Sequence, residues 1–249
     1  MAETQKSGLW DVLASLKQMN WADLTHAFDV GSPHYAADRP MTRERIADYA
    51  SQGYRAEYFG LPGQWGTHMD PPAHFHDGAA AADAIPVTDM LLPLVVLDIH
   101  EQVSRDPDYT VTRAGIADWE RRFGKIPEGA FVALRSDWSK HWPDQAAMEN
   151  RDADGLSHAP GWSREPLEFL FETRAITAIG HETLDTDPGL AASRGDFSLE
   201  SYALARGRYQ IGLLANLDRV PESGAIVSVT WPKIHKGSGF PARVFAIFP

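Results

Sequence analysis

Side chains able to bind a metal are concentrated between Gly63 and Asp77, where three histidines, two carboxylates and a glutamine fall within fifteen residues. His68 and Asp70 are two residues apart, so on an extended segment both side chains point to the same face. Met69 then points the other way, towards a core. An imidazole beside a carboxylate suits a borderline or hard divalent cation such as Zn²⁺ or Mn²⁺. The spacing therefore predicts a pair of metal ligands on one strand face.

Two prolines directly follow this pair and make the connection to the next histidine stiff. Pro71 and Pro72 fix φ and lack backbone donors, so the strand has to end there and His74 follows at a short, nearly rigid distance. A buried, hydrogen-bonded histidine beside a strand-ending aspartate is the alternative for His68 and Asp70. With His74, His76 and Gln64 nearby, a metal site and that alternative explain the residues about equally well.

The composition restricts the kind of site that this chain can build. It has 249 residues, 43% of them hydrophobic, which is enough for one large domain with a full core. There is no cysteine, so any metal has to be held by nitrogen and oxygen. The net charge of −11 argues against binding to nucleic acid, which needs clustered Lys and Arg.

The sequence shows neither a membrane span nor a signal peptide. No run of about 18 apolar residues predicts a membrane span. The segment from Met1 to Lys17 lacks the apolar run of a signal peptide. We therefore expect no membrane contact and, by default, a cytoplasmic location.

Strand and helix patterns alternate along the chain, but several strands follow each other without a helix between them. Residues 91–99 form a near-continuous apolar run that predicts a buried central strand, and Thr112 to Gly124 is the clearest helix. Further strands are expected at residues 20–26, 54–60, 130–134, 175–180, 209–216, 225–231 and 243–248, and helices at 163–171 and 198–206. This order predicts an α/β fold with a mixed sheet or barrel-like β core and helices outside it. We expect one domain over residues 1–249, with a short helical extension at about residues 1–19.

Two other groups of polar residues have a more ordinary explanation. His181 and Glu182, with Asp185 and Asp187 close behind, fit a turn at a strand end better than a second metal site. Ser136 has no glycine-flanked nucleophile elbow around it, which argues against a serine hydrolase.

The stretch from Gly66 to His74 reads Gly-Thr-His-Met-Asp-Pro-Pro-Ala-His. It resembles the signature of the cyclase family, which includes bacterial kynurenine formamidases and isatin hydrolases. Four further segments agree with that family in their order along the chain, namely residues 23–25, 180–187, 216–221 and 237–243. The resemblance spans nearly the whole chain and implies the swivelling β/β/α fold of that family.

Three positions depart from the two-metal members of this family. The first histidine of their signature, a zinc ligand in the formamidases, is Gln64 here. A glutamate that bridges the metals falls at Gly212, and a further histidine falls near Glu200 or Ser201. The resemblance therefore implies a single divalent cation, with Mn²⁺ as the first choice and Zn²⁺ as the alternative.

The ligands that the resemblance implies for this cation lie on two segments. His68 and Asp70 are retained from the signature. Gln210, two residues before Gly212 and so on the same strand face, is the expected third ligand.

The form of the signature is most similar to the isatin hydrolase branch. This similarity implies a cyclic amidase that uses water to open isatin, a small aromatic carbonyl compound, to isatinate. His74 is then the general acid and base. Gln64, Trp65 and Phe75 are the expected substrate-binding residues, with plain core packing an equally good explanation for the two aromatic rings.

Other functions remain open at this point. One is an arylformamidase acting on N-formylkynurenine, and another is a catalytically idle member that binds a small molecule. A lactonase or dehydrating cyclase is the third. The missing second-metal ligands argue against the formamidase, and the retained His68, Asp70 and His74 argue against the idle protein. The resemblance also implies self-association, as a homodimer or a larger assembly.

Overall fold

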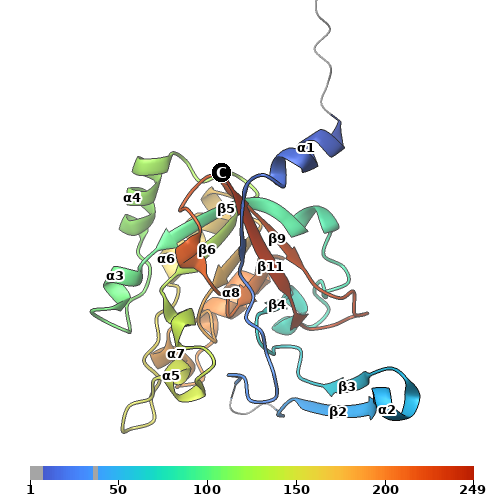
Figure 1. Cartoon of the computed structure of the whole chain (residues 1–249). Helices are drawn as coiled ribbons and strands as arrows, with labels where there is room; N and C mark the ends of the chain where they lie inside the picture. The colour runs from blue at the N-terminus through green and yellow to red at the C-terminus, as the bar shows by residue number, and fades with distance from the viewer. Residues whose placement is uncertain (1–7, 36–38) are drawn as a thin grey trace, which may run out of the picture.

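The computed structural model describes residues 8–35 and 39–249 and contains one large sheet with helices packed around it (Figure 1). In spatial order its strands are β1 (Asn20–Asp23), β11 (Arg243–Phe248), β9 (Ala225–Thr230), β5 (Leu91–Asp98), β6 (Phe131–Arg135), β7 (Ala178–His181), β8 (Tyr209–Gly212), β4 (His68–Asp70) and β10 (Phe240–Pro241). The strands from β5 to β8 are parallel to one another, and every other pairing in this sheet is antiparallel. The mixed sheet predicted from the sequence is confirmed.

The apolar run of β5 lies inside the sheet, between β9 and β6. Successive side chains of a strand point to opposite faces, so the run supplies two cores at once. Val95 and Leu97 belong to the core under the helices, whereas Leu94 and Val96 belong to the core on the other face. Burial on both faces explains why this strand is a continuous apolar run rather than an alternating one.

The sheet is curled into a half-barrel around the second of these cores. Ala22 of β1 and Met69 of β4 come from strands near opposite edges of the sheet, yet both belong to the same buried cluster. The other face is covered by helices, which contribute Ile116, Leu167 and Tyr202 to its core. The curl brings strands from the two edges towards each other.

The helices of the described residues are α1 (Leu9–Leu16), α2 (Tyr49–Gln52), α3 (His100–Val103), α4 (Arg113–Phe123), α5 (Gln145–Glu149), α6 (Arg164–Glu168), α7 (Gly189–Ala192) and α8 (Ser198–Ala205). α4 begins where the sequence predicts it, because Thr112 Oγ1 accepts a hydrogen bond from the Gly115 amide at 3.1 Å. None of these helices has the length and apolar character that crossing a membrane requires.

Two elements stand apart from the large sheet (Figure 1). β2 (Thr42–Ala47) and β3 (Ala56–Gly60) pair only with each other and form a projecting hairpin that carries α2 at its tip. The sequence predicted β3 but neither β2 nor the separation of this pair from the large sheet. α1 confirms the predicted N-terminal helix over Leu9–Leu16 and has no buried residue, while residues 1–7 of the predicted extension lie outside the described part.

Candidate active site

The pairing of β4 with β8 brings the predicted ligands together. The two strands are antiparallel, with His68 opposite Gly212 and Asp70 opposite Gln210. Met69, between the two β4 residues, is fully buried on the other face. The alternation of side chains along both strands therefore places His68, Asp70 and Gln210 on one face of the sheet.

Side-chain atoms of these three residues converge on Asp70 Oδ2. His68 Nε2 lies 3.4 Å from Asp70 Oδ2, and Gln210 Nε2 lies 3.3 Å from the same oxygen. Two ligand atoms at about 2.1 Å from one cation, at tetrahedral or octahedral angles, are separated by about 3.0–3.4 Å. The three side chains are buried, which limits their motion. The corner thus fits one divalent cation.

Gln210 is the expected third ligand, but its amide oxygen does not face the corner. In the described residues no three His, Cys, Asp or Glu side chains are grouped so that they could hold a metal. Gln210 directs Nε2 towards Asp70 and Glu200, and its Oε1 accepts a hydrogen bond from Thr186 Oγ1 at 2.6 Å. Ligation through Oε1 needs a half-turn of the amide. Thr186 permits this turn, because a hydroxyl accepts as well as donates.

The protonation of the His68–Asp70 pair also suits a cation. His68 Nδ1 is 2.7 Å from the Gly66 carbonyl, so Nδ1–H donates to it and Nε2 faces Asp70. Burial acts against both charges, but Asp70 outweighs it and raises the pKa of His68. Burial likewise opposes ionisation of Asp70, yet the His68 imidazole holds the pKa of that carboxyl well below its usual range. His68 therefore carries a proton on Nε2 beside the ionised Asp70, where a bound cation would replace that proton.

Gln64 lines the cavity, but its amide is held by the protein. Its Nε2 donates to Asp70 Oδ1 at 3.1 Å and to the Ser238 carbonyl at 3.0 Å. Because a Cβ at Gly239 would overlap Gln64 Nε2, only glycine fits there. With Oδ1 engaged, Asp70 presents Oδ2 alone to the corner. The first role of Gln64 in this geometry is thus to orient Asp70.

His74 lies on the short 3-10 turn Pro72–His74 that the two prolines begin. Its side chain is 29% exposed and lines the cavity. Its Nε2 is 3.8 Å from Glu200 Oε1, and its ring meets that of Phe75 edge-on at 5.0 Å. His74 is therefore next to the three-donor corner without being part of it, as a mobile proton carrier requires.

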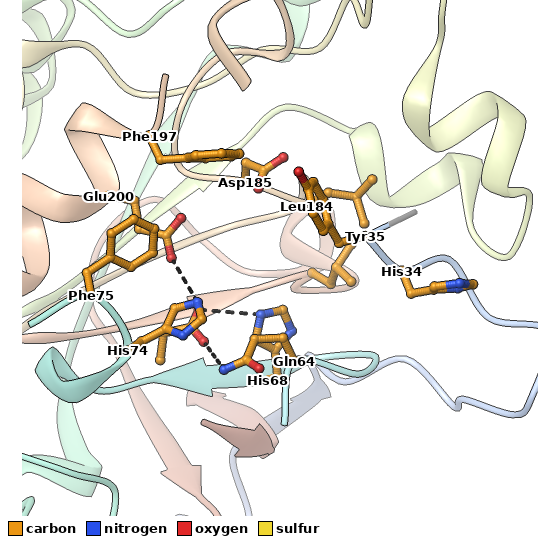
Figure 2. A pocket seen from close by; sticks show the side chains of 12 residues that line it. His34, Tyr35, Gln64, His68, His74, Phe75, Leu184, Asp185, Phe197 and Glu200 are labelled. Atoms are coloured by element: carbon orange, nitrogen blue, oxygen red, sulfur yellow. Dashed lines mark hydrogen bonds and ion pairs between the residues drawn. The ribbon is translucent and has the colours of Figure 1, made fainter. Parts of the chain in front are cut away.

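The corner opens into a cavity of about 470 Å³. Figure 2 shows Phe197 and Leu184 across this cavity from His68 and His74. The lining consists of His34, Tyr35, Gln64, His68, Asp70, His74, Phe75, Leu184, Asp185, Phe197, Glu200 and Leu213. Polar and apolar side chains are mixed in the lining, since Asp185 lies between Phe197 and Leu184 and Phe75 lies beside His74 (Figure 2). Such a cavity suits a small flat ligand with carbonyl oxygens on one edge.

The structure corrects the expectation for Trp65. Its side chain is 0% exposed and does not line the cavity. The indole donates to the Asp29 carbonyl at 3.2 Å and stacks on the ring of His34 at 4.5 Å, and His34 in turn faces the cavity. Gly66, with φ of +63°, turns the chain between Trp65 and His68, so alternation does not carry across this point. Phe75, in contrast, lines the cavity as expected.

Two carboxyl groups of the cavity were not predicted from the sequence. Glu200, from the first turn of α8, is 2.8 Å from Gln210 Nε2, and burial with Asp70 and Asp185 nearby raises its pKa well above the usual range. Burial, with Asp187 close by, raises the pKa of Asp185 to about 7. A local signal existed only for Asp185, which belongs to the acidic cluster after β7. Within this segment Thr183 Oγ1 donates to the Asp185 carbonyl, and Asp187 accepts hydrogen bonds from two amides of α8.

His181 lies beside His68 but does not complete a group of three His, Cys, Asp or Glu ligands within the described residues. Burial, with His68 beside it, lowers the pKa of His181 to about 3, so this imidazole is neutral. A Cβ at Gly212 would lie 2.9 Å from His68 Cε1, so a side chain there would displace the ligand. Ser136 donates from its amide and hydroxyl to Glu182, which gives it a structural role.

Comparison with known proteins agrees with this geometry. The Cyclase family model matches residues 22–188. The isatin hydrolase of Roseibium aggregatum is 31% identical over 225 residues, which cover 87% of this chain and 85% of that protein. Isatin hydrolase A from Labrenzia aggregata, solved with benzyl benzoate, has a TM-score of 0.89 at 32% identity, covering 97% of this chain and 99% of that one. An isatin hydrolase bound to the product analogue thioisatinate has a TM-score of 0.91 at 28% identity over 100% of both chains.

Proposed function

The chain belongs to the cyclase family, and we propose that it is a metal-dependent hydrolase that opens the cyclic amide of isatin with water to give isatinate. The observation that carries this proposal is the three-donor corner of His68, Asp70 and Gln210 with His74 at its side. Relatives that are 28–32% identical over most of the chain are named isatin hydrolases. The cavity is lined by both polar and aromatic side chains, which such a substrate requires.

We infer that His68, Asp70 and Gln210 hold one Mn²⁺, with Zn²⁺ as the alternative. An imidazole, a carboxylate and an amide oxygen suit a cation between hard and soft, and the chain has no thiolate to favour a softer one. When bound, a divalent cation lowers the pKa of water and polarises the carbonyl under attack. Gln64 keeps Asp70 in place by binding its second oxygen.

His74 supplies the proton transfers of this proposal. It takes a proton from the attacking water as the oxygen forms a bond to the amide carbon. The ring carbon–nitrogen bond then breaks, and His74 returns the proton to the leaving nitrogen. One proton carrier serves both steps, because the aryl nitrogen leaves more readily when it is protonated. The rings of Phe75 and Phe197 both line the cavity, with their centres 6.4 Å apart, and the aromatic part of the substrate would pack against them.

The test is a turnover assay on a sample of known metal content. The purified protein is stripped with a chelator, reloaded with Mn²⁺ or Zn²⁺, and incubated with isatin or N-formylkynurenine while the absorbance is followed. We expect isatin to be opened by the reloaded protein and not by the stripped one. Turnover of N-formylkynurenine alone would contradict the proposed substrate.

Self-association is a further part of this proposal. Apolar side chains are exposed on both projecting elements, α1 and the hairpin, and these include Leu9, Trp10, Ile46, Tyr49 and Tyr58. Isolated hairpins are marginally stable in water, and contact with a second copy would cover these side chains. Light scattering of the purified protein tests this inference, with a monomer as the contradicting result.

The cytoplasmic location stays a prediction.

A further inference from the structure

One wall of the cavity is formed by a segment that lies outside the strands and helices of the described residues. His34 and Tyr35 belong to this segment and line the cavity. Figure 2 shows them on the opposite side of the cavity from His74 and Phe75. Because such a segment lacks the regular hydrogen bonds of a sheet or helix, other groups have to hold it in place.

A single side chain binds both backbone groups of His34. The His34 amide donates to Gln145 Oε1 at 2.8 Å, and Gln145 Nε2 donates to the His34 carbonyl at 2.9 Å. These two bonds are equivalent to those that a neighbouring antiparallel strand exchanges with one residue. The two residues are 111 positions apart in the sequence, so the contact joins distant parts of the chain.

Gln145 is itself held in the orientation that these bonds require. Its Nε2 also donates to Glu149 Oε1 at 2.9 Å, within the same short helix α5. Asp144 caps this helix by accepting hydrogen bonds from two of its backbone amides. Met148 of α5 is 1% exposed and belongs to the core under the helices. Gln145 therefore connects the cavity wall to a helix that the core holds in place.

The side chain of His34 provides a separate attachment. Its ring stacks on the buried indole of Trp65 with ring centres 4.5 Å apart, and its Nδ1 lies 2.9 Å from the Ser32 carbonyl. The indole in turn donates to the Asp29 carbonyl at 3.2 Å. These contacts hold the ring and the start of the segment. In the part of the chain that the structure describes, only Gln145 binds the His34 backbone.

We propose that Gln145 is a positioning residue that holds the wall of His34 and Tyr35 where the substrate packs against it. This proposal rests on the proposed function, since it assumes that the substrate occupies this cavity. Gln145 does not line the cavity and acts through the His34 backbone. Without its two bonds, a smaller fraction of the protein has the wall in place and is ready to bind the substrate. His74 lies on another element, so the steps of bond making should not change.

The test replaces Gln145 by methionine, which has a similar shape but only a weakly accepting thioether in place of the amide. Hydrogen exchange at the His34 amide, followed by NMR, reports the attachment directly, and kcat and KM for isatin report its effect on function. In Gln145→Met we expect faster exchange of this amide. We also expect KM to rise by about 5–100-fold, the loss that two neutral hydrogen bonds can cause, with kcat unchanged. A merely structural role would lower kcat and thermal stability rather than change KM alone.

Gln102→Met is the matched control. Gln102 is exposed on α3 and does not line this cavity. This variant should keep the wild-type exchange at His34 and the wild-type KM and kcat. Thermal unfolding shows whether each variant retains the fold. If Gln145→Met does not fold, Gln145→Ala takes its place, because the site is partly exposed and a smaller side chain is tolerated there.

The outcomes separate this proposal from the proposed function. Wild-type exchange at the His34 amide of the folded Gln145 variant, or a wild-type KM for isatin, would overturn the role of Gln145. If the wild-type protein does not open isatin, the proposed substrate fails, whereas exchange at His34 still decides whether Gln145 holds the wall.

Discussion

Two strand pairs of the same sheet are both largely buried but carry opposite chemistry. β5 and β6, at the centre, present aliphatic side chains to both cores. β4 and β8, nearer the edge, present His68, Asp70 and Gln210 on the face towards the cavity. Buried charged groups cost free energy unless they are paired or hydrogen-bonded, and here each has such a partner. The first pair stabilises the fold, and the second uses part of that stability to hold a reactive site.

The largest effect is expected for substitution of the proton carrier His74, which should lower activity without lowering stability. His74→Ala removes the group that moves the proton, so kcat for isatin should fall by about 10²–10⁴-fold, while Mn²⁺ content and thermal stability stay close to the wild type. Steady-state kinetics with metal analysis checks this. His76→Ala is the control, because His76 bonds to the Ser201 carbonyl and does not line the cavity. Full activity of His74→Ala would show that another group carries the proton.

A substitution in the central strands β5 and β6 should instead lower stability without lowering activity. Leu97 of β5 is 3% exposed and belongs to the core under the helices. Leu97→Ala should lower the free energy of unfolding by about 2–5 kcal/mol, through lost burial and a residual cavity, without changing kcat per folded molecule. Urea unfolding and active-site titration measure the two quantities. A drop in kcat with unchanged stability would remove the distinction between these regions.

The burial of Asp185 should make the free energy of unfolding depend on pH. Its pKa is raised to about 7 in the folded protein, against a value of 3.8 without burial. Between about pH 4 and pH 7 the folded state then binds more protons than the unfolded state, so the free energy of unfolding falls as the pH rises. Asp185→Asn abolishes this contribution, and its stability should fall less over that window.

Urea unfolding of metal-free protein across this pH range is the appropriate measurement, because a bound cation would itself lower the pKa of Asp185. Asp118→Asn, at an exposed site on α4, serves as the control and should follow the wild-type curve. Identical pH profiles for the wild type and Asp185→Asn would show that Asp185 ionises normally in the folded protein.

The smallest effect is expected at the apolar wall of the cavity. Phe75 lies 6.4 Å from Phe197, ring centre to ring centre, and both line the cavity. If the substrate ring packs there, Phe75→Leu should raise KM for isatin by about 2–10-fold, the loss of one aromatic contact, with little change in kcat. Trp65→Phe, behind His34, should leave KM unchanged. Equal effects of the two substitutions on KM would mean that Phe75 acts through packing alone.

The common face of the ligand pair could be predicted from the sequence because strand geometry is local and regular, and alternation placed His68 and Asp70 on it. Gln210 was added from the family resemblance, and the structure places it opposite Asp70, while its role as a ligand stays a prediction. The apolar run of β5 likewise identified a central strand. These features depend on a repeat of two residues and on burial, both of which are visible in the order of the residues.

Other parts of the site depend on contacts that local patterns do not contain. Glu200 reaches Gln210 and His74 only because α8 packs beside β8, and nothing within its own helix marks it. Trp65 was assigned to the substrate because it neighbours the ligands in sequence, but the positive φ of Gly66 directs it into the core. The hairpin strand β2 was missed because nearly all of its residues are exposed. Its sequence therefore lacks the alternation of apolar and polar residues that a strand with one buried face shows.

The most direct test of the single-cation site is a comparison of wild type and Asp70→Asn in one experiment. Each protein is purified, reloaded with Mn²⁺, freed of excess metal, and analysed for bound metal and for isatin turnover. We expect one Mn²⁺ per chain and turnover in the wild type, with both lost in a folded Asp70→Asn protein, because Asp70 Oδ2 faces both other donors. Turnover that persists after complete metal removal, or normal Mn²⁺ binding by Asp70→Asn, would contradict a cation held at this corner.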